Sequence, residues 1–160
     1  MLDFRSHLID EYQLNERVFI ALVETLPKDR LAEPAGGIVN HPIWTVGHLA
    51  NAGDMLRGIL GHERVTSREY VTLFDTGSTP VHNSSIYPSL HQLVSDYQRV
   101  HQSVCEMIRD LSDTEITKLV EIEEAKPKFP THGHLLSHIV SWHEGVHYGQ
   151  LVQWRAAADC

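Results

Sequence analysis

Histidine is the residue type whose number and spacing carry most of the chemical information in this sequence. The 160-residue chain contains 12 histidines, and imidazole is both a common metal ligand and a group that titrates near neutral pH. His143 and His147 are four residues apart. On a helix this spacing places both rings on one face, about 6 Å apart along the axis. Two imidazoles in this arrangement can reach a single ion.

A second pair with the same spacing, His134 and His138, precedes the first pair on the same expected helix. On a continuous α-helix the two pairs point to nearly opposite sides. The face of the 143/147 pair also carries Leu136, Val140, Leu151 and Trp154. The solvent side is expected to hold Ser137, Ser141, Glu144, Tyr148 and Arg155. We therefore expect the 143/147 pair to face the core and the 134/138 pair to lie toward an edge.

His48 is a third histidine that faces the expected core. It lies at the centre of an apolar arc, whereas Asp54 and Arg57 fall on the far side of the same helix. A histidine on a core face is costly unless its nitrogens have partners. A shared cation would satisfy three neutral imidazoles at once, since each ring offers it a lone pair. The arc around His48 consists of Trp44, Ala52, Met55, Leu56 and Ile59.

Ordinary explanations for these histidines stay open at this point. A single HxxxH pair is often incidental, and a single core histidine is usually held by hydrogen bonds. His101, on the apolar face of another expected helix, is either such a core residue or a pocket residue that acts as acid or base. Trp44, Trp142 and Trp154 are expected as core or interface anchors.

Four segments have the periodicity of amphipathic helices, at about 3–26, 42–60, 88–111 and 131–158. Pro42 suits a first helical turn, Gly61 suits a helix end, and Thr131 suits an N-cap. Short helices are expected near 68–74 and 113–119. The connection 61–87 is long enough to cross the length of a bundle, so the second and third helices can run parallel. The chain is thus expected to be a single all-α four-helix bundle domain over residues 1–160.

Composition and charge exclude several classes of partner. Hydrophobic residues make up 42% and charged residues 21%, an ordinary globular mixture. The formal net charge of -8 argues against nucleic acid and against anionic membrane surfaces, which attract clustered positive charge. No apolar run reaches membrane-spanning length, and a cytoplasmic location is expected. Cys105 and Cys160 lack CxxC spacing and are predicted to be free thiols.

Two stretches together resemble a known family. The segment Trp44-Thr-Val-Gly-His48-Leu-Ala is similar to the second-helix motif of the DinB/YfiT-like superfamily, and His143-Glu-Gly-Val-His147-Tyr-Gly-Gln150 resembles its HxxxHxGQ signature. The order and separation of the motifs fit as well. The resemblance implies an up-down-down-up four-helix bundle, often dimeric. It also implies a divalent metal, zinc or nickel, on His48, His143 and His147, with iron or manganese as alternatives.

The resemblance also suggests a class of chemistry. Some relatives use low-molecular-weight thiols to transfer or isomerise small-molecule substrates, and many have no known activity. Our leading hypothesis is a metal-dependent enzyme of thiol-transferase or hydrolase type. His101 and Glu16 are candidates for proton handling, and Asn15 is a candidate support for the ligands. The alternatives are a non-catalytic metal-binding or stress-response protein of the same fold, and a bundle whose histidines bond only to each other and to water.

Overall fold

The computed structural model describes residues 3–123 and 125–158. These residues form helices and no strand, apart from two isolated bridges, so the predicted all-helical class is confirmed for the described part of the chain. The elements are α1 (Phe4–Glu24), α2 (Pro42–Ile59), α3 (Glu69–Phe74), the 3-10 turn η1 (Ser84–Ile86), α4 (Leu90–Asp110), α5 (Asp113–Thr117), α6 (His132–Ser137), the π-helical turn η2 (His138–His143) and α7 (Glu144–Ala158).

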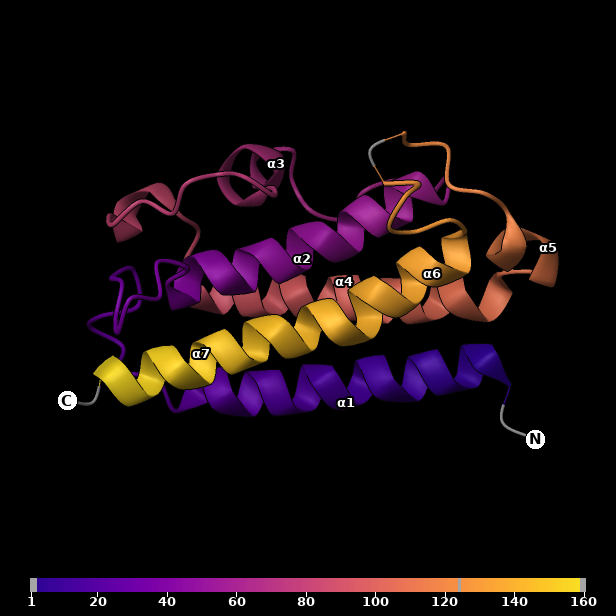
Figure 1. The fold of residues 1–160 in the computed structure, drawn as a ribbon. Coiled ribbons are helices and arrows are strands. Elements are labelled where there is room, and N and C mark those ends of the chain that lie inside the picture. The colour runs from indigo at the N-terminus through magenta and orange to yellow at the C-terminus, as the bar shows by residue number, and fades with distance from the viewer. Residues whose placement is uncertain (1–2, 124, 159–160) are drawn as a thin grey trace.

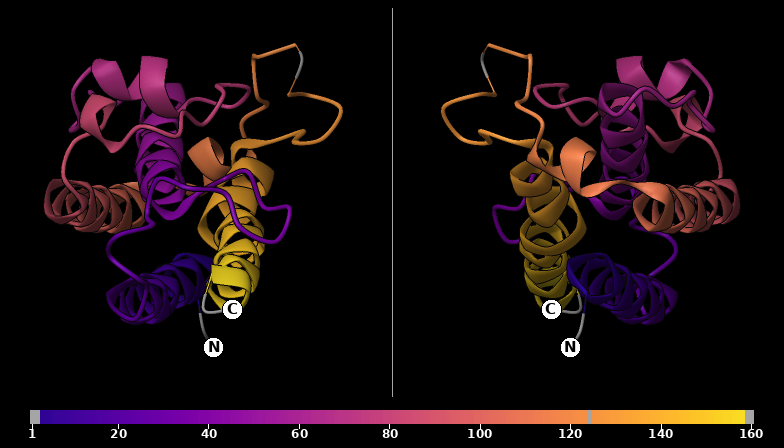
Figure 2. Two further views of the ribbon diagram at one scale, coloured as in Figure 1. Left: turned by 90° about the vertical axis from the view of Figure 1, so that its left-hand side faces the viewer. Right: turned by 90° about the vertical axis from the view of Figure 1, so that its right-hand side faces the viewer.

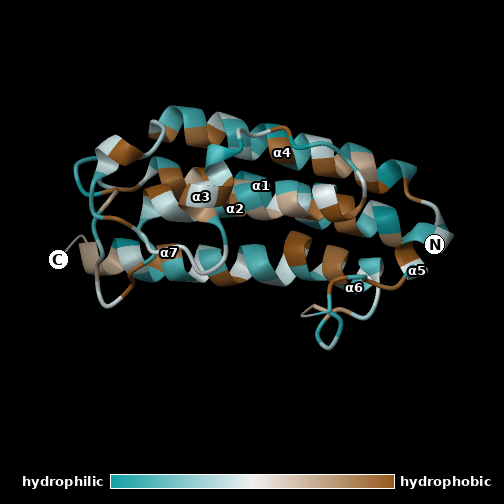
Figure 3. Ribbon diagram, turned by 90° about the horizontal axis from the view of Figure 1, so that it is seen from above, coloured by the Kyte–Doolittle hydropathy of each residue, from teal (hydrophilic) through white to brown (hydrophobic). Residues whose placement is uncertain are grey.

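The long helices lie side by side around one core. In Figure 1, α1 runs from right to left, α2 and α4 run from left to right, and the segment from α6 to α7 runs back from right to left. The end-on views of Figure 2 show α3 and the loop before α6 on the same side of the molecule, above α2 and α7. In Figure 3, hydrophobic and hydrophilic residues alternate along each long helix. The largest fully buried side chains include Trp154, Tyr12, Tyr97, Phe19 and Phe74.

Helix α2 is buried on nearly all sides, which the sequence analysis did not anticipate. Every residue from His41 to Asp54 is buried, because the bundle covers one face and the crossover containing α3 covers the other (Figure 2). Asp54, which the sequence analysis places on the side away from the apolar arc, is buried there because the crossover covers that side. Its carboxylate is fully buried, accepts hydrogen bonds from the backbone N–H groups of Val65 and Thr66, and is 3.5 Å from a guanidinium nitrogen of Arg64.

Both ends of α2 follow from local sequence. Pro42 occupies the first turn, where its missing N–H costs nothing. The Nδ1 atom of the preceding His41 accepts a hydrogen bond from the N–H of Trp44, and its Nε2 lies 3.1 Å from the carbonyl oxygen of Val81. His41 thus fixes the start of the helix and the end of the crossover together. Gly61, with a φ of 86°, follows the last turn in the left-handed region that favours glycine.

The fourth helical segment is not the continuous α-helix predicted for 131–158. Thr131 caps its start, as predicted, but residues His138–His143 form a π-helical turn between α6 and α7. A π turn accommodates about one extra residue, which rotates the following positions by about 100° relative to an uninterrupted α-helix. The predicted relation between the two histidine pairs depended on that uninterrupted phase, so it does not hold in the structure.

The π turn is held by side chains of α1. The amide of Asn15 donates a hydrogen bond of 2.8 Å to the carbonyl oxygen of Val140, and the hydroxyl of Ser141 donates to the carboxylate of Glu11. A π turn loosens the regular backbone ladder, so an outside donor to one of its carbonyls helps to satisfy it. Asn15 therefore supports, through a backbone contact, the turn that carries His138 and His143.

Three smaller predictions can be compared with the described residues. Cys105 is buried and free, and burial raises the pKa of its thiol to about 11. The prediction for Cys160 lies outside the described residues. Trp44 and Trp154 are core residues as predicted, but Trp142 is 63% exposed. Among the described residues, no helix combines the length and apolar character needed to cross a membrane.

Replacing Gly47 with alanine should destabilise the fold. A Cβ atom at this position would clash with the ring of Phe74, whereas one at Gly58 on the same helix meets nothing within 4 Å. We expect Gly47→Ala to lower the free energy of unfolding by about 1–3 kcal/mol through overpacking. The matched Gly58→Ala change should raise it by up to ~1 kcal/mol through helix propensity. Urea denaturation measures both, and equal effects of the two substitutions would contradict the packing argument.

Candidate metal centre

The ring of His48 is fixed by the crossover. Its Nδ1 atom lies 2.7 Å from the backbone carbonyl oxygen of Phe74. A carbonyl only accepts, so Nδ1 carries the proton and Nε2 presents a lone pair. Trp44 stacks on the same ring, with centroids 4.5 Å apart and planes 10° apart. The small Gly47 lets Phe74 approach α2 closely enough to make this hydrogen bond.

His143 and His147 bring their rings to the free side of His48. His143 is the last residue of the π turn and His147 lies one turn into α7. The Nε2 atoms of His48 and His143 are 3.1 Å apart, and one potential ligand nitrogen from each of the three rings lies within 4.8 Å of the others. The structure therefore brings together the three residues that the sequence analysis selected.

Burial keeps all three imidazoles neutral. It is the main cause that lowers the pKa of His48, and it lowers the pKa of His143 to about 3 and that of His147 to about 4. Repulsion from the neighbouring rings lowers the pKa of His143 and His147 further. Neutral imidazole is the form that binds metals, so protons do not compete effectively for these nitrogens near pH 7.

The donor set fits a divalent transition metal. The Nδ1 atoms of His143 and His147 lack a hydrogen-bond partner among the described residues, so neither ring is tied through Nδ1 to another protein group. In tetrahedral zinc sites the Zn–N distance is about 2.0–2.1 Å, which places two ligand nitrogens roughly 3.3 Å apart. The 3.1 Å separation of the His48 and His143 Nε2 atoms is close to that value. Without an ion, Nε2 of His143 would carry the proton and donate it to Nε2 of His48; a cation shared by the three rings would instead use a lone pair from each.

The three histidines lie in the wall of a cavity of about 770 Å³. The cavity lies between α2, the segment after α3, the loop before α6 and the π turn. Its apolar wall is formed by Trp44, Ala52, Met55, Phe129, Leu135, Ile139 and Trp142. Its other polar residues are Asn51, Asp75, Thr76, Lys128 and His138. A large apolar cavity with a few converging polar groups is typical of a small-molecule site.

His138 and Trp142 belong to this cavity, contrary to the sequence expectation. His138 was expected toward an edge, away from the 143/147 pair, but its ring centroid lies 5.8 Å from that of His143. The π turn explains the difference, because it brings residues five positions apart onto one side. His138 packs between Phe129 and Trp142, with centroid distances of 4.5 and 5.0 Å. Trp142, although exposed, forms part of the cavity wall.

Glu144, expected on the solvent side, is buried behind the histidines. Its Oε2 atom accepts a 2.8 Å hydrogen bond from the hydroxyl of Tyr97, and its Oε1 atom is 3.3 Å from Nε2 of His101. A carboxylate in the core is tolerated because these side chains take the place of water. Glu144 directly follows His143, so the contacts with α4 also fix the backbone at a candidate ligand.

The other candidates lie outside the cavity wall. His101 is fully buried, stacks on Tyr12 with centroids 3.5 Å apart, and does not line the cavity. Glu16 is about a quarter exposed, and its carboxylate lies 3.8 Å from Nδ1 of His101. Glu144, Asp75 and His138 were missed as site residues. A continuous helical phase hid Glu144 and His138, and Asp75 lies in an irregular segment.

Removing the hydroxyl of Tyr97 should destabilise the protein more than removing that of Tyr12. Both side chains are fully buried, but the hydroxyl of Tyr97 donates to Glu144, whereas that of Tyr12 has no partner among the described residues. We expect Tyr97→Phe to lower the free energy of unfolding by about 1–3 kcal/mol and Tyr12→Phe to change it little or raise it. Chemical denaturation measures both. Equal losses would show that the bond to Glu144 contributes nothing.

Comparisons with known proteins agree with this geometry. No curated protein matches the sequence. A protein of solved crystal structure from Streptococcus pneumoniae has a similar fold, with a TM-score of 0.68 over 98% of this chain and 93% of that chain, at 13% sequence identity. At that identity the likeness concerns the fold alone. The model of the DinB superfamily matches residues 11–151, a range that includes all three histidines. The chain therefore belongs to the DinB superfamily.

Proposed function

We propose that this protein is a metal-dependent enzyme of thiol-transferase or hydrolase type, with a divalent metal ion on His48, His143 and His147. The observation that carries the proposal is the position of three neutral, converging imidazoles in the wall of a cavity of about 770 Å³. A structural zinc site usually has four protein ligands and is closed, whereas a catalytic site has three and leaves a position free. The three-histidine set beside a cavity matches the second arrangement.

The residues around the histidines have separable roles in this proposal. A bound metal would supply Lewis acidity that lowers the pKa of water or of a thiol. The carbonyl of Phe74 holds His48 in the tautomer that presents Nε2. Trp44 stacks on that ring and, with Trp142, forms part of the wall that a bound substrate would cover. His101 and Glu16 do not line the cavity, and neither does Glu144, the carboxylate that His101 contacts, so proton handling by either residue has no direct contact with a molecule in the cavity.

The finer features of the family resemblance are also proposals for this chain. We propose zinc or nickel as the metal, since imidazole suits both, with iron or manganese as alternatives. The substrate would be a small molecule, with a low-molecular-weight thiol as partner. The directions of α1, α2, α4 and α6–α7 in Figure 1 support an up-down-down-up bundle, and the resemblance supports a homodimer. The net charge of -8 supports neither nucleic acid nor an anionic membrane as partner.

Loss of any of the three histidines should abolish metal binding. Protein purified without a histidine tag is expected to bind about one equivalent of zinc or nickel, measured by elemental analysis and calorimetry. His48→Ala, His143→Ala and His147→Ala should each weaken binding by more than about 100-fold, because two imidazoles hold an ion poorly. His91→Ala is the matched control, since His91 is exposed at the start of α4.

The same variants decide whether the metal takes part in a reaction. Zinc- or nickel-loaded wild-type protein is screened for conjugation or hydrolysis with several biological thiols. Activity that survives in His48→Ala would remove the metal from the mechanism. A metal that is bound tightly, raises the melting temperature strongly and supports no turnover would instead favour the non-catalytic alternative.

Stability of the metal-free protein should fall on acidification. The pKa values of His143 and His147 are lowered in the folded state to about 3 and about 4, from an ordinary value of 6.5. At a pH between the folded-state pKa values and 6.5, these histidines bind protons in the unfolded chain but not in the folded chain. The free energy of unfolding therefore decreases as pH falls below about 6.5. Each histidine contributes a slope of up to ~1.4 kcal/mol per pH unit.

Urea denaturation of metal-free protein between pH 7.5 and pH 5 measures this slope. His48, His41, His132 and His138 also have pKa values lowered by burial, so part of the slope should persist in a His143→Ala/His147→Ala double variant. The double variant should nevertheless lose stability less steeply than wild type. An unchanged slope would mean that these two imidazoles are not neutral and buried in solution.

A further inference from the structure

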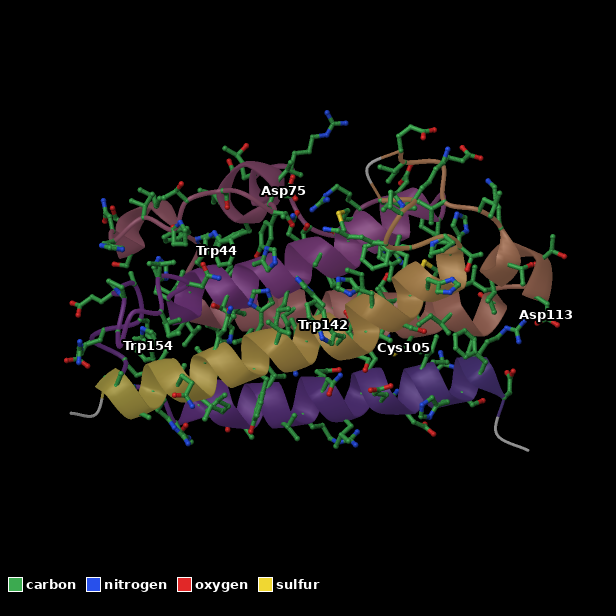
Figure 4. All side chains as sticks on the ribbon, in the orientation of Figure 1. Trp44, Asp75, Cys105, Asp113, Trp142 and Trp154 are labelled. Atoms are coloured by element: carbon green, nitrogen blue, oxygen red, sulfur yellow. The ribbon has the colours of Figure 1, made fainter. Side chains whose placement is uncertain are left out.

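Asp75 and Asn51 interrupt the otherwise apolar side of the cavity next to His48. Asp75 directly follows Phe74, whose carbonyl accepts the hydrogen bond from His48, and it lines the same cavity as that histidine. It is also close enough to His48 for its charge to raise the pKa of that ring. Figure 4 labels Asp75 beyond α3, Trp44 on α2 and Trp142 on the opposite helical segment.

A chain of hydrogen-bonded and ion-paired side chains that leads to the buried Asp54 holds Asp75 in place. The side-chain amide of Asn51, which is 2% exposed, donates a 3.3 Å hydrogen bond to Oδ1 of Asp75. The carbonyl oxygen of Asn51 accepts a 2.8 Å hydrogen bond from Arg64. Arg64 in turn is paired with the fully buried Asp54. Asn51 therefore has both ends of its amide engaged, and it cannot turn away from Asp75 without breaking the bond to Arg64.

This arrangement leaves Asp75 with unused capacity on the cavity side. A carboxylate has about four acceptor positions, and the amide of Asn51 occupies one of them. Asp75 is only half-buried and lines the cavity. A fixed carboxylate among apolar walls favours an N–H donor or a cation, because charge-assisted hydrogen bonds strengthen when water is partly excluded. The aromatic rings of Trp44, Phe129 and Trp142 suit the apolar body of the same ligand and tolerate a nearby cation.

We propose that Asp75, positioned by Asn51, is the residue that selects the substrate, and that it binds the ammonium group of a small molecule with an apolar, aromatic-sized body. The inference rests on the proposed function for one point, that the reacting end of this molecule lies at the three histidines. Selection by Asp75 itself needs no metal, since it follows from the cavity and its charge. The substrate class is thus an apolar amine, with the amine toward α3 and the body between the tryptophans.

Lys128 is the other charged side chain among the described residues that line the cavity. Lys128 is exposed, lies in the loop before α6, and is close enough to lower the pKa of His138. Its charge therefore acts on the part of the cavity near His138, whereas Asp75 belongs to the segment after α3. An acidic group on the substrate would be directed to Lys128, while the amine would be directed to Asp75.

Three probes of one shape test the selection: 2-phenylethylamine as cation, 2-phenylethanol as neutral molecule, and 3-phenylpropanoate as anion. Dissociation constants are measured for the full metal-free chain by nuclear magnetic resonance, with the indole N–H signals of Trp44 and Trp142 as local reporters. We expect the amine to bind about tenfold more tightly than the anion and about fivefold more tightly than the alcohol, and the difference to shrink with added salt.

Variants assign the preference to one carboxylate. Asp75→Asn keeps the shape of the side chain and should remove the advantage of the amine, and Asn51→Ala should reduce it. Glu69→Gln changes the net charge equally at an exposed site on α3 and should leave the preference intact. If Asp75→Asn does not fold, the wild-type ranking of the three probes decides alone. Equal binding of the probes, no binding of the amine, or an unchanged preference in folded Asp75→Asn would overturn the proposal.

The outcome is separable from that of the metal proposal. If elemental analysis finds no metal but the amine ranks first and the ranking depends on Asp75, the proposed reaction fails and the selection stands. If metal binds to the three histidines but the probes bind equally, the metal centre stands and the selection is overturned. Repeating the ranking with zinc-loaded protein then shows whether a bound metal changes the order.

Discussion

The hydrogen bond from His48 to the carbonyl of Phe74 is the contact on which the site depends. It joins α2 to a crossover that is far away in sequence, and it fixes the tautomer that turns Nε2 toward His143 and His147. The contact exists because Gly47 leaves room for the ring of Phe74 and because His41 fixes the start of α2. Burial then keeps the imidazoles neutral. The packing of α2 and the geometry of the candidate metal ligands therefore both depend on the dense covering of α2 on both faces.

The π turn is the second structural constraint, because it adjusts the phase of the ligand-bearing helix. On a regular α-helix, His138 and His143 would face different sides, because they are five positions apart. The π turn brings their rings beside each other. Asn15 satisfies a carbonyl of the turn from α1, and Tyr97 holds Glu144 from α4. Two neighbouring helices thus stabilise an irregularity that a helix in isolation would resist. Irregular helical turns of this kind are frequent at functional sites.

Much of the fold could be predicted from periodicity, because four long segments carry apolar stripes and their ends carry suitable caps. The three candidate ligands could also be predicted, since i,i+4 spacing and a centred core position depend only on local helix geometry. What failed depended on tertiary contacts. The burial of Asp54 requires the crossover to cover α2, and the burial of Glu144 requires partners on α4. A π turn has no distinct sequence pattern here, so the phase of His138 was misjudged, and Asp75 had no periodic element to place it.

The division between helices and loops suggests how such a site could acquire different substrates. The histidines belong to helical segments whose positions are set by the core, so they vary little without loss of the fold. The groups that would contact a substrate beyond the ligands, Asp75 and Lys128, lie in segments that pack on the outside of the bundle. A loop tolerates change in charge and length more easily than a buried helix. Because Asp75 is tied through Asn51 and Arg64 to the buried Asp54, this loop residue nevertheless has a defined position, as a group that selects a ligand must.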